Sequence, residues 1–227
     1  MRTRVPMLRL RSRCRSAVGR TIRGVSKMLN RTASIGPNDH AARFYKHFGR
    51  GSIINWPTGN MYGERWISIG EDTMIAADVT LSAGMVPNQE MMTDPVVIIG
   101  DRCLIGRGSA IVGHYRIDIG DDVFTGMNVY ITDQNHGYEN LDEPIGKQLP
   151  NEQPVSIGEG AWIGSGAIIL PGSKIGDHVV VGANSVVTGE IPSYSVAVGS
   201  PARVVRQYDG NSWERKETRI SDPDEQI

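Results

Sequence analysis

Residues 157–187 read IGEGAWIGSGAIILPGSKIGDHVVVGANSVV, with an aliphatic residue at every sixth position. Glycine directly follows most of these aliphatic residues. A strand alternates with a period of two and a helix with a period near 3.6, so neither explains a spacing of six with glycine in phase. A short repeat of this kind indicates a solenoid in which each unit stacks on its neighbours.

The same spacing recurs in five groups of three along the chain. The positions are Ile69, Ile75, Leu81; Ile99, Ile105, Ile111; Ile119, Thr125, Ile131; Ile157, Ile163, Ile169; and Ile175, Val181, Val187. All but Thr125 are aliphatic, and the residue two positions earlier is mostly small or β-branched. Each hexad therefore predicts one short strand and one turn, whose Gly, Asn or Asp accepts a positive φ. Three hexads predict one triangular coil.

The expected fold is all-β, a parallel β-helix shaped as a triangular prism with aliphatic residues inside. Only 6% of the residues are aromatic, which fits a narrow core of stacked Ile and Val. Residues 52–54 and Trp66 are expected to add an incomplete first coil.

Two insertions interrupt the repeat, at residues 87–98 and 137–156, and a two-residue slip lies at Ile117-Asp118. Insertions in a solenoid become side loops, often at the binding face.

The two ends of the chain differ from the repeat. Residues 1–31 contain ten Arg or Lys and no acid, whereas the remainder has a net charge of −11. Val18, Ile22, Val25 and Leu29 fall on one face of a helix, opposite basic residues. We therefore predict a basic helical arm over 1–48, a β-helix domain over 49–206 and a polar tail over 207–227. From Asp209 the tail is expected to fray or to end in a short helix.

Composition excludes several classes of protein. There is no apolar run of about 18 residues, so no transmembrane helix is expected. The two cysteines, Cys14 and Cys103, cannot build a disulfide framework and favour a reducing, cytoplasmic location. The acidic solenoid argues against nucleic acid as a partner. The basic arm fits a transit peptide, a peripheral membrane helix or a flexible extension.

His136 is the residue that most clearly suggests chemistry, because it stands where the repeat ends and the longer insertion begins. An imidazole, with a pKa of about 6.5, can accept a proton at neutral pH and so serves as a general base. Asp133, a loop carboxylate or a backbone carbonyl could orient its second nitrogen.

The segments 131–138, 157–165 and 198–206 resemble hexapeptide-repeat acyltransferases, especially the galactoside, maltose and xenobiotic acetyltransferase group. The resemblance covers about residues 50–206. It implies a left-handed β-helix and a homotrimer with active sites between subunits. It also implies transfer from acetyl-CoA, or another acyl-CoA, to a hydroxyl of a sugar or glycoconjugate, with no metal.

The resemblance also implies roles for individual residues. His136 would be the catalytic base. Positions that match the family's CoA-binding groove are Trp162, Gly164, Ser165, Ala183, Arg203 and Arg206. Residues placed to line the acceptor pocket are Asp133, Asn135, Tyr138, Asn128 and His114. One departure is Gly189, where galactoside-type members carry a lysine.

Two alternatives stay open. Zinc enzymes of the γ-carbonic-anhydrase type share the fold, but they need two nearby His and a third one coil away. Here only His40 and His47 are close in sequence, and both precede the repeat. A β-helix scaffold without enzymatic activity is the second alternative.

Overall fold

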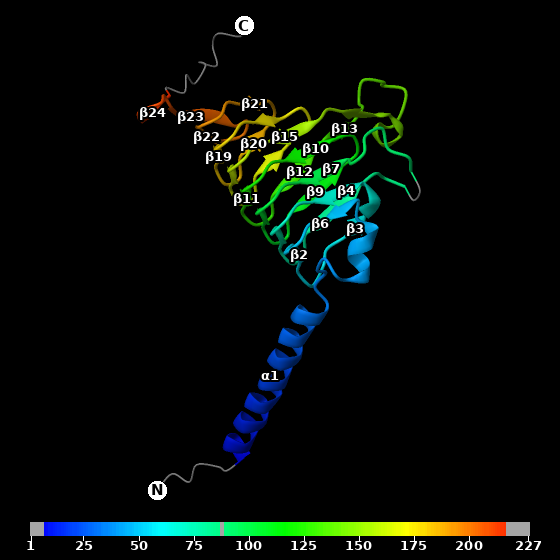
Figure 1. The fold of residues 1–227 in the computed structure, drawn as a ribbon, viewed down its shortest axis with the longest axis vertical. Coiled ribbons are helices and arrows are strands. Elements are labelled where there is room, and N and C mark those ends of the chain that lie inside the picture. Colours follow the sequence, from blue (N-terminus) through cyan, green and yellow to red (C-terminus); the bar gives the residue numbers. More distant parts are fainter. Residues whose placement is uncertain (1–6, 87–88, 217–227) are drawn as a thin grey trace.

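A computed structural model of the chain describes residues 7–86 and 89–216. Three sheets wind around one axis, and the chain passes from each sheet to the next as it climbs (Figure 1). Sheet 1 contains β1 (His47–Phe48), β4 (Ile67–Ile69), β7 (Val97–Ile99), β10 (Ile117–Ile119), β15 (Val155–Ile157), β18 (Lys174–Ile175) and β21 (Glu190–Ile191). Sheet 2 contains β2 (Ile53–Ile54), β5 (Met74–Ile75), β8 (Leu104–Ile105), β11 (Phe124–Thr125), β16 (Trp162–Ile163), β19 (Val180–Val181) and β22 (Ser195–Val198). Sheet 3 contains β3 (Met61–Tyr62), β6 (Thr80–Ala83), β9 (Ala110–Gly113), β12 (Tyr130–Thr132), β17 (Ile168–Ile169) and β20 (Val186–Val187). All pairings among these strands are parallel, which confirms the predicted triangular β-helix.

The first coil is complete, whereas the sequence indicated an incomplete one. β1, β2 and β3 place one strand in each of the three sheets. Their inward residues, Phe48, Ile54 and Met61, are in register with Ile69, Ile75 and Leu81 of the next coil. The spacing of these three is six and then seven, and only one is an isoleucine, so the hexad pattern did not reveal them.

The repeated aliphatic residues fill the prism. Ile75, Ile105 and Ile163 are among the fully buried side chains. Burying one such side chain contributes about 1.5–3 kcal/mol. Thr125, the one polar residue in the series, is also buried, and its hydroxyl accepts a hydrogen bond of 2.8 Å from the amide of Gly106. A hydroxyl is thus accommodated in the core because its hydrogen bond is made internally.

Two positions of each hexad carry a backbone requirement, one for a positive φ and one for close contact between coils. Positive φ angles occur three residues after the inward residue, as at Asp72 and Asn128. The glycine directly after the inward residue meets a different need, the close approach of the next coil. A Cβ added at Gly106 would lie 2.0 Å from the carbonyl oxygen of Gly126. The sequence analysis predicted glycine for its φ alone, but stacking distance is the reason here.

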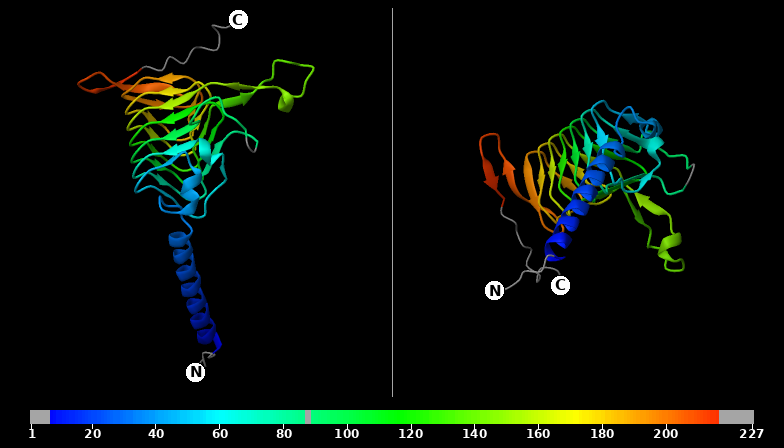
Figure 2. Two further views of the ribbon diagram at one scale, coloured as in Figure 1. Left: turned by 45° about the vertical axis from the view of Figure 1, so that its right-hand side comes forward. Right: turned by 90° about the horizontal axis from the view of Figure 1, so that it is seen from below.

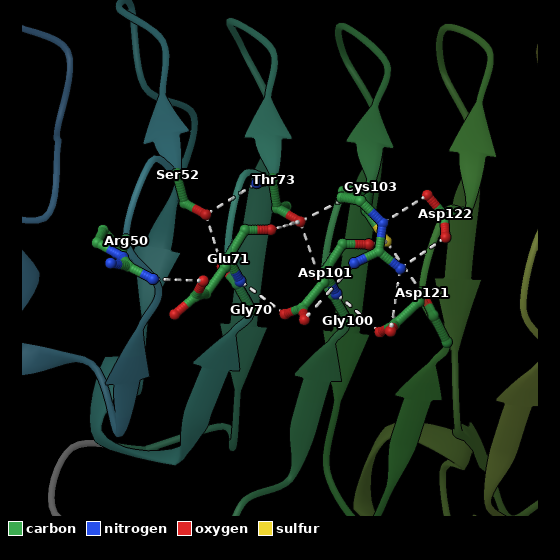
Figure 3. Close-up of polar contacts among 12 residues, drawn as sticks. Arg50, Ser52, Gly70, Glu71, Thr73, Gly100, Asp101, Cys103, Asp121 and Asp122 are labelled. Carbon is green, nitrogen blue, oxygen red and sulfur yellow. Dashed lines mark hydrogen bonds and ion pairs between the residues drawn. The ribbon is translucent and has the colours of Figure 1, made fainter.

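Small polar residues at one corner connect neighbouring coils (Figure 3). Ser52 Oγ accepts a hydrogen bond of 2.8 Å from the Thr73 amide, and Thr73 Oγ1 accepts one of 2.9 Å from the Cys103 amide. On the outer side, the carboxylate of Asp121 accepts a hydrogen bond from the Asp101 amide. Cys103 is buried, as expected of an inward small position. The ladder satisfies backbone groups that stacking removes from water.

The C-terminal end of the prism is closed by antiparallel strands. β23 (Arg203–Tyr208) pairs with β22, and β24 (Trp213–Arg215) pairs with β23. The predicted fraying or short helix from Asp209 is therefore wrong for residues 213–215, because their backbone pairs along β23. Residues 217–227 of the predicted tail lie outside the described residues.

At the opposite end, α1 (Met7–Thr32) extends away from the prism (Figure 1). The short helices η1 (His40–Phe44) and η2 (Glu64–Trp66) lie between α1 and the second coil in sequence. Val18, Ile22 and Val25 of α1 are exposed together with its basic residues. None of the helices among the described residues has the length and hydropathy needed to cross a bilayer.

Candidate functional site

Both insertions and the two-residue slip leave the prism at one corner, where sheet 3 passes to sheet 1. The first insertion follows β6, the two-residue slip follows β9, and the second insertion follows β12. Because these strands are neighbours in sheet 3, the three segments stack on one another at the edge of the prism. This corner is therefore the candidate location of a functional site, because irregular segments there extend beyond the regular coils.

The second insertion forms a two-stranded arm that projects from the prism (Figure 2). Its strands are β13 (Gln134–His136) and β14 (Pro150–Glu152), which pair antiparallel, and η3 (Ile145–Lys147) lies between them. We call residues 134–152 the arm. The sequence placed His136 at the start of irregular backbone, but it lies in regular β13, opposite Pro150.

Asp133 fixes the base of the arm. Its side chain is 0% exposed, and one carboxylate oxygen accepts hydrogen bonds from the amides of Tyr115 (2.8 Å) and Arg116 (2.7 Å). The amide of His114 also donates to this carboxylate, at 2.8 Å. Burial raises the pKa of Asp133 above its ordinary value, although these amides favour the carboxylate form. Asp133 therefore holds the corner together and is closed to a substrate, contrary to the expected pocket role.

His136 and Asn135 line an open cavity of about 460 Å³ between the arm and the prism. The other lining residues are Met85, Tyr130, Thr132, Gln134, Gly146, Lys147, Gln148 and Leu149. No carboxylate is among these lining residues, so the titratable groups at the cavity are His136, Tyr130 and Lys147. An exposed imidazole on the wall of a cavity of this size can meet a hydroxyl of a small ligand.

The remaining residues expected at the acceptor pocket do not join this cavity. Asn128 lies in the turn before β12, with φ 58°, at the other end of that strand from the arm. The side chain of His114 is only 12% exposed, and its ring contacts Glu152 and Gln89, neither of which lines the cavity. Tyr138 is exposed on the arm and is not among the lining residues.

Several lining residues escaped the sequence analysis. Tyr130, Thr132 and Gln134 precede His136 on β12 and β13. Their nearness to His136 in sequence could have indicated them. Lys147 and Leu149 come from the far side of the arm, and no periodicity in the sequence places them near His136.

The residues expected to bind CoA gather at a different corner, where sheet 2 passes to sheet 3. Gly164 and Ser165 follow β16, and Ala183 follows β19 one coil further on. Backbone hydrogen bonds stack these turns: the Gly164 amide donates to Val181, and the Asn184 amide donates to Ser165. The Ser165 hydroxyl accepts from the Met127 amide at 3.1 Å, so it already has a structural partner.

Trp162 and the two arginines belong to sheet 2. Trp162 is 51% exposed. On successive strands towards the C-terminal end of sheet 2, the residues in register with it are Val180, Val196 and Arg206. Arg203 and Arg206 are both exposed on β23. An aromatic ring and two guanidinium groups thus share one outer face of the prism.

The two groups of predicted residues lie at opposite ends of sheet 3. Ser165 lies in the turn at the start of β17, whereas His136 follows the end of the neighbouring strand β12. About five strand residues separate the two corners, or about 16 Å at 3.3 Å per residue. The two groups of predicted residues therefore line different corners of the prism.

Within the described residues there is no cluster of three His, Cys, Asp or Glu side chains suited to a metal ion. The ring of His114 contacts Glu152 and Gln89, whereas His136 lines the cavity.

Two family models match the chain. "Bacterial transferase hexapeptide (six repeats)" matches residues 154–189, and "Hexapeptide repeat of succinyl-transferase" matches residues 96–133. The chain belongs to the hexapeptide-repeat acyltransferase family. These matches fall on the coils before and after the arm. The residues that match the family models are therefore the ones that form the triangular repeat.

Curated relatives include three bacterial proteins. A probable acetyltransferase of Mycobacterium tuberculosis is 35% identical over 66% of this chain and 45% of its own length. The putative lipopolysaccharide biosynthesis O-acetyl transferase WbbJ of Escherichia coli is 35% identical over 53% of this chain and 66% of its own length. The galactoside O-acetyltransferase of Escherichia coli is 33% identical over 63% of this chain and 65% of its own length. The chain thus spans between about half and just under two thirds of the length of these relatives.

Among solved structures, AntD, an N-acyltransferase from Bacillus cereus, shares the fold. A mutant of AntD, in complex with dTDP-4-amino-4,6-dideoxyglucose and coenzyme A, superposes with a TM-score of 0.63 at 20% identity. The match covers 76% of this chain and 89% of AntD. The predicted left-handed parallel β-helix is confirmed.

Proposed function

We propose that this family member is a CoA-dependent acyltransferase that moves an acetyl group from acetyl-CoA, or a related acyl group, to a hydroxyl of a sugar or glycoconjugate. The observation that carries the proposal is His136, which stands exposed on the wall of a ligand-sized cavity at the base of the arm. The names of WbbJ and of the galactoside O-acetyltransferase support an oxygen acceptor and a sugar. AntD, by its name, transfers to nitrogen.

In this proposal His136 acts as the general base. Its neutral ring nitrogen accepts the proton of the acceptor hydroxyl while the oxygen attacks the thioester carbonyl carbon. The carbon–sulfur bond then breaks, and the departing CoA sulfur receives the proton from the imidazolium. The products are an ester on the acceptor and free CoA thiol, with no covalent intermediate on the protein. A positioned base of this kind contributes about 10²–10⁴-fold to the rate.

CoA is proposed to lie along the outer corner that bears Gly164, Ser165 and Ala183. Backbone groups at these turns would bind the pantetheine arm, and Trp162 would cover it on the adjacent face. Arg203 and Arg206 would pair with the phosphates, because a guanidinium binds phosphate oxygens in pairs. The binding of CoA by AntD supports this proposal.

A homotrimer would complete the site by bringing the CoA corner of one subunit beside His136 of another, because the two lie at different corners of one chain. Sheet 2 offers a surface for it. Its outward row is apolar throughout and consists of Ile53, Met74, Leu104, Phe124, Trp162, Val180 and Val196. An exposed apolar row of this kind is typical of an interaction surface, and here it would be the contact between subunits. Light scattering should give the mass of three chains for the wild type and of one for Phe124→Lys, and a monomeric wild type would contradict the trimer.

Peripheral contact with an anionic membrane is proposed for residues 1–31. On α1 the apolar face of Val18, Ile22 and Val25 lies opposite Arg20 and Lys27, and each basic residue near an anionic surface contributes about 1 kcal/mol. Binding to phosphatidylserine vesicles should weaken with salt and be lost on deleting residues 1–31. Ile22→Ser keeps the charge and should also weaken binding, whereas equal binding by the deletion would reject the contact.

The transferase activity is tested by a screen of sugars and glycoconjugates with acetyl-CoA, in which released thiol and acetylated product are both measured. We expect thiol release that depends on the acceptor, and a rise in melting temperature with millimolar CoA. A folded trimer that neither releases thiol with any acceptor nor responds to CoA would instead indicate a scaffold.

A further inference from the structure

His114 joins two segments that each contribute to the lining of the cavity. One is the first loop, residues 84–86 and 89–96, and the other is the arm. His114 Nε2 lies 2.7 Å from Gln89 Nε2 in the first loop, and His114 Nδ1 is hydrogen bonded to Glu152 Oε1 in the arm. These partners are 25 and 38 residues away in sequence, so the contacts arise only because the insertions stack at one corner.

The hydrogen bonds around Gln89 define the tautomer of His114. Gln89 Oε1 accepts hydrogen bonds from the amides of Met85 (2.9 Å) and Val86 (3.3 Å), so its amino group is the atom that faces the histidine. An amino group donates only, and His114 Nε2 must therefore accept. The ring proton consequently lies on Nδ1 and is donated to the carboxylate of Glu152. His114 is thus a bridge with one accepting and one donating end.

Each end of this bridge leads to a cavity wall. On the loop side, Gln89 accepts a hydrogen bond from the backbone amide of Met85, and Met85 lines the cavity. On the arm side, Glu152 is in register with Gln134 of β13, two residues before His136. Both Gln134 and His136 line the cavity. The bridge therefore controls the loop wall through Gln89 and the wall that bears His136 through Glu152.

His114 itself does not meet the ligand space. It is not among the cavity's lining residues, and its side chain is 12% exposed, compared with 19% for Glu152. A direct role in the chemistry is thus unsupported. His114 was expected to contact the acceptor, but its contacts make it a support for the segments that line the cavity.

We propose that His114 is a positioning residue for the proposed acyl transfer, which sets the separation of the two cavity walls through Gln89 and Glu152. The inference rests on the proposed function of His136. Its distinctive consequence is that the two halves of the bridge govern different kinetic constants. The arm half places the base, so its loss lowers kcat, whereas the loop half shapes the acceptor wall, so its loss raises the acceptor KM.

Two substitutions separate the halves. In His114→Asn the side-chain amide overlays Nδ1, so the donor to Glu152 is kept and the acceptor for Gln89 is lost. In His114→Gln the amide reaches the Nε2 position, so the acceptor for Gln89 is kept and the donor to Glu152 is lost. Both variants replace the imidazole with a neutral amide, and each therefore serves as the matched control for the other.

We expect His114→Gln to lower kcat at least tenfold with an acceptor KM within about twofold of wild type, since a displacement of about 1 Å can reduce the rate up to a hundredfold. We expect His114→Asn to raise the acceptor KM about fivefold or more and to retain most of kcat. The KM for acetyl-CoA should be unchanged in both. Equal changes in the two variants, or none in either, would overturn the proposal.

Hydrogen–deuterium exchange tests the bridge without reference to activity. His114→Gln should increase exchange at the amides of the arm, and His114→Asn should increase it at the first loop, with the coils unchanged in both. If each variant increases exchange only in its own segment but the wild type transfers no acyl group, the structural role of His114 is supported and the proposed function is refuted. If exchange rises equally in both segments for both variants, or in neither, the bridge is refuted whatever the activity.

Discussion

Removal of the Asp133 carboxylate is the most direct test of how the arm is attached to the prism. In Asp133→Ala, the amides of His114, Tyr115 and Arg116 lose their acceptor at a buried corner. A buried donor left without a partner costs about 1–3 kcal/mol. Three such donors would cost at least about 3 kcal/mol, and relief of the carboxylate's own burial, which raises its pKa, offsets part of any larger sum.

We therefore expect Asp133→Ala to reduce the free energy of unfolding by about 3 kcal/mol. For a chain of this size, 1 kcal/mol corresponds to about 2–4 °C, so the melting temperature should fall by about 6–12 °C. Asp133→Asn keeps one carbonyl oxygen as an acceptor, so its melting temperature should fall by about half as much. Thermal unfolding followed by circular dichroism measures both.

Glu143→Ala is the matched control, because it removes an exposed carboxylate from the arm itself. Its effect should stay within about 0.5 kcal/mol. If Asp133→Ala melted at the same temperature as Glu143→Ala, the three amides would have found other hydrogen-bond acceptors. The role given to Asp133 at the base of the arm would then be wrong.

Three further outcomes follow from the coil. Gly106→Ala should lower the melting temperature by more than 10 °C or prevent folding, because its Cβ would lie 2.0 Å from a carbonyl oxygen, whereas Gly189→Ala, with open space around it, should be neutral in the same melt. Thr125→Val should cost about 1–3 kcal/mol in denaturant titration, because the Gly106 amide loses its acceptor. Burial raises the pKa of Cys103 to about 11, so its alkylation at pH 8 should be no faster than unfolding, and rapid labelling of the folded chain would contradict its place in the core.

The repeat could be predicted from sequence because stacking imposes the same requirement at every coil. Ile105 and Ile163 both fill the prism, and the glycine after each allows the next coil to approach. The first coil was underestimated because Phe48 and Met61 occupy the inward positions without that regular spacing.

The site was only partly predictable. His136 was identified because it stands where the phase breaks, and the structure places it at a cavity. Asp133 was assigned to the pocket because it is near in sequence, but its carboxylate turns inward to cap three amides. The bridge made by His114 joins residues from two insertions, and no local pattern in the sequence encodes their contact.

The measurement that tests the account most directly is the steady-state rate of acetyl transfer by His136→Ala, compared with the wild type on an acceptor identified by the screen. We predict a fall in kcat of about 10²–10⁴-fold, with the melting temperature, the oligomeric state and the KM for acetyl-CoA preserved. Turnover within a few-fold of wild type by the folded variant would show that His136 is not the base.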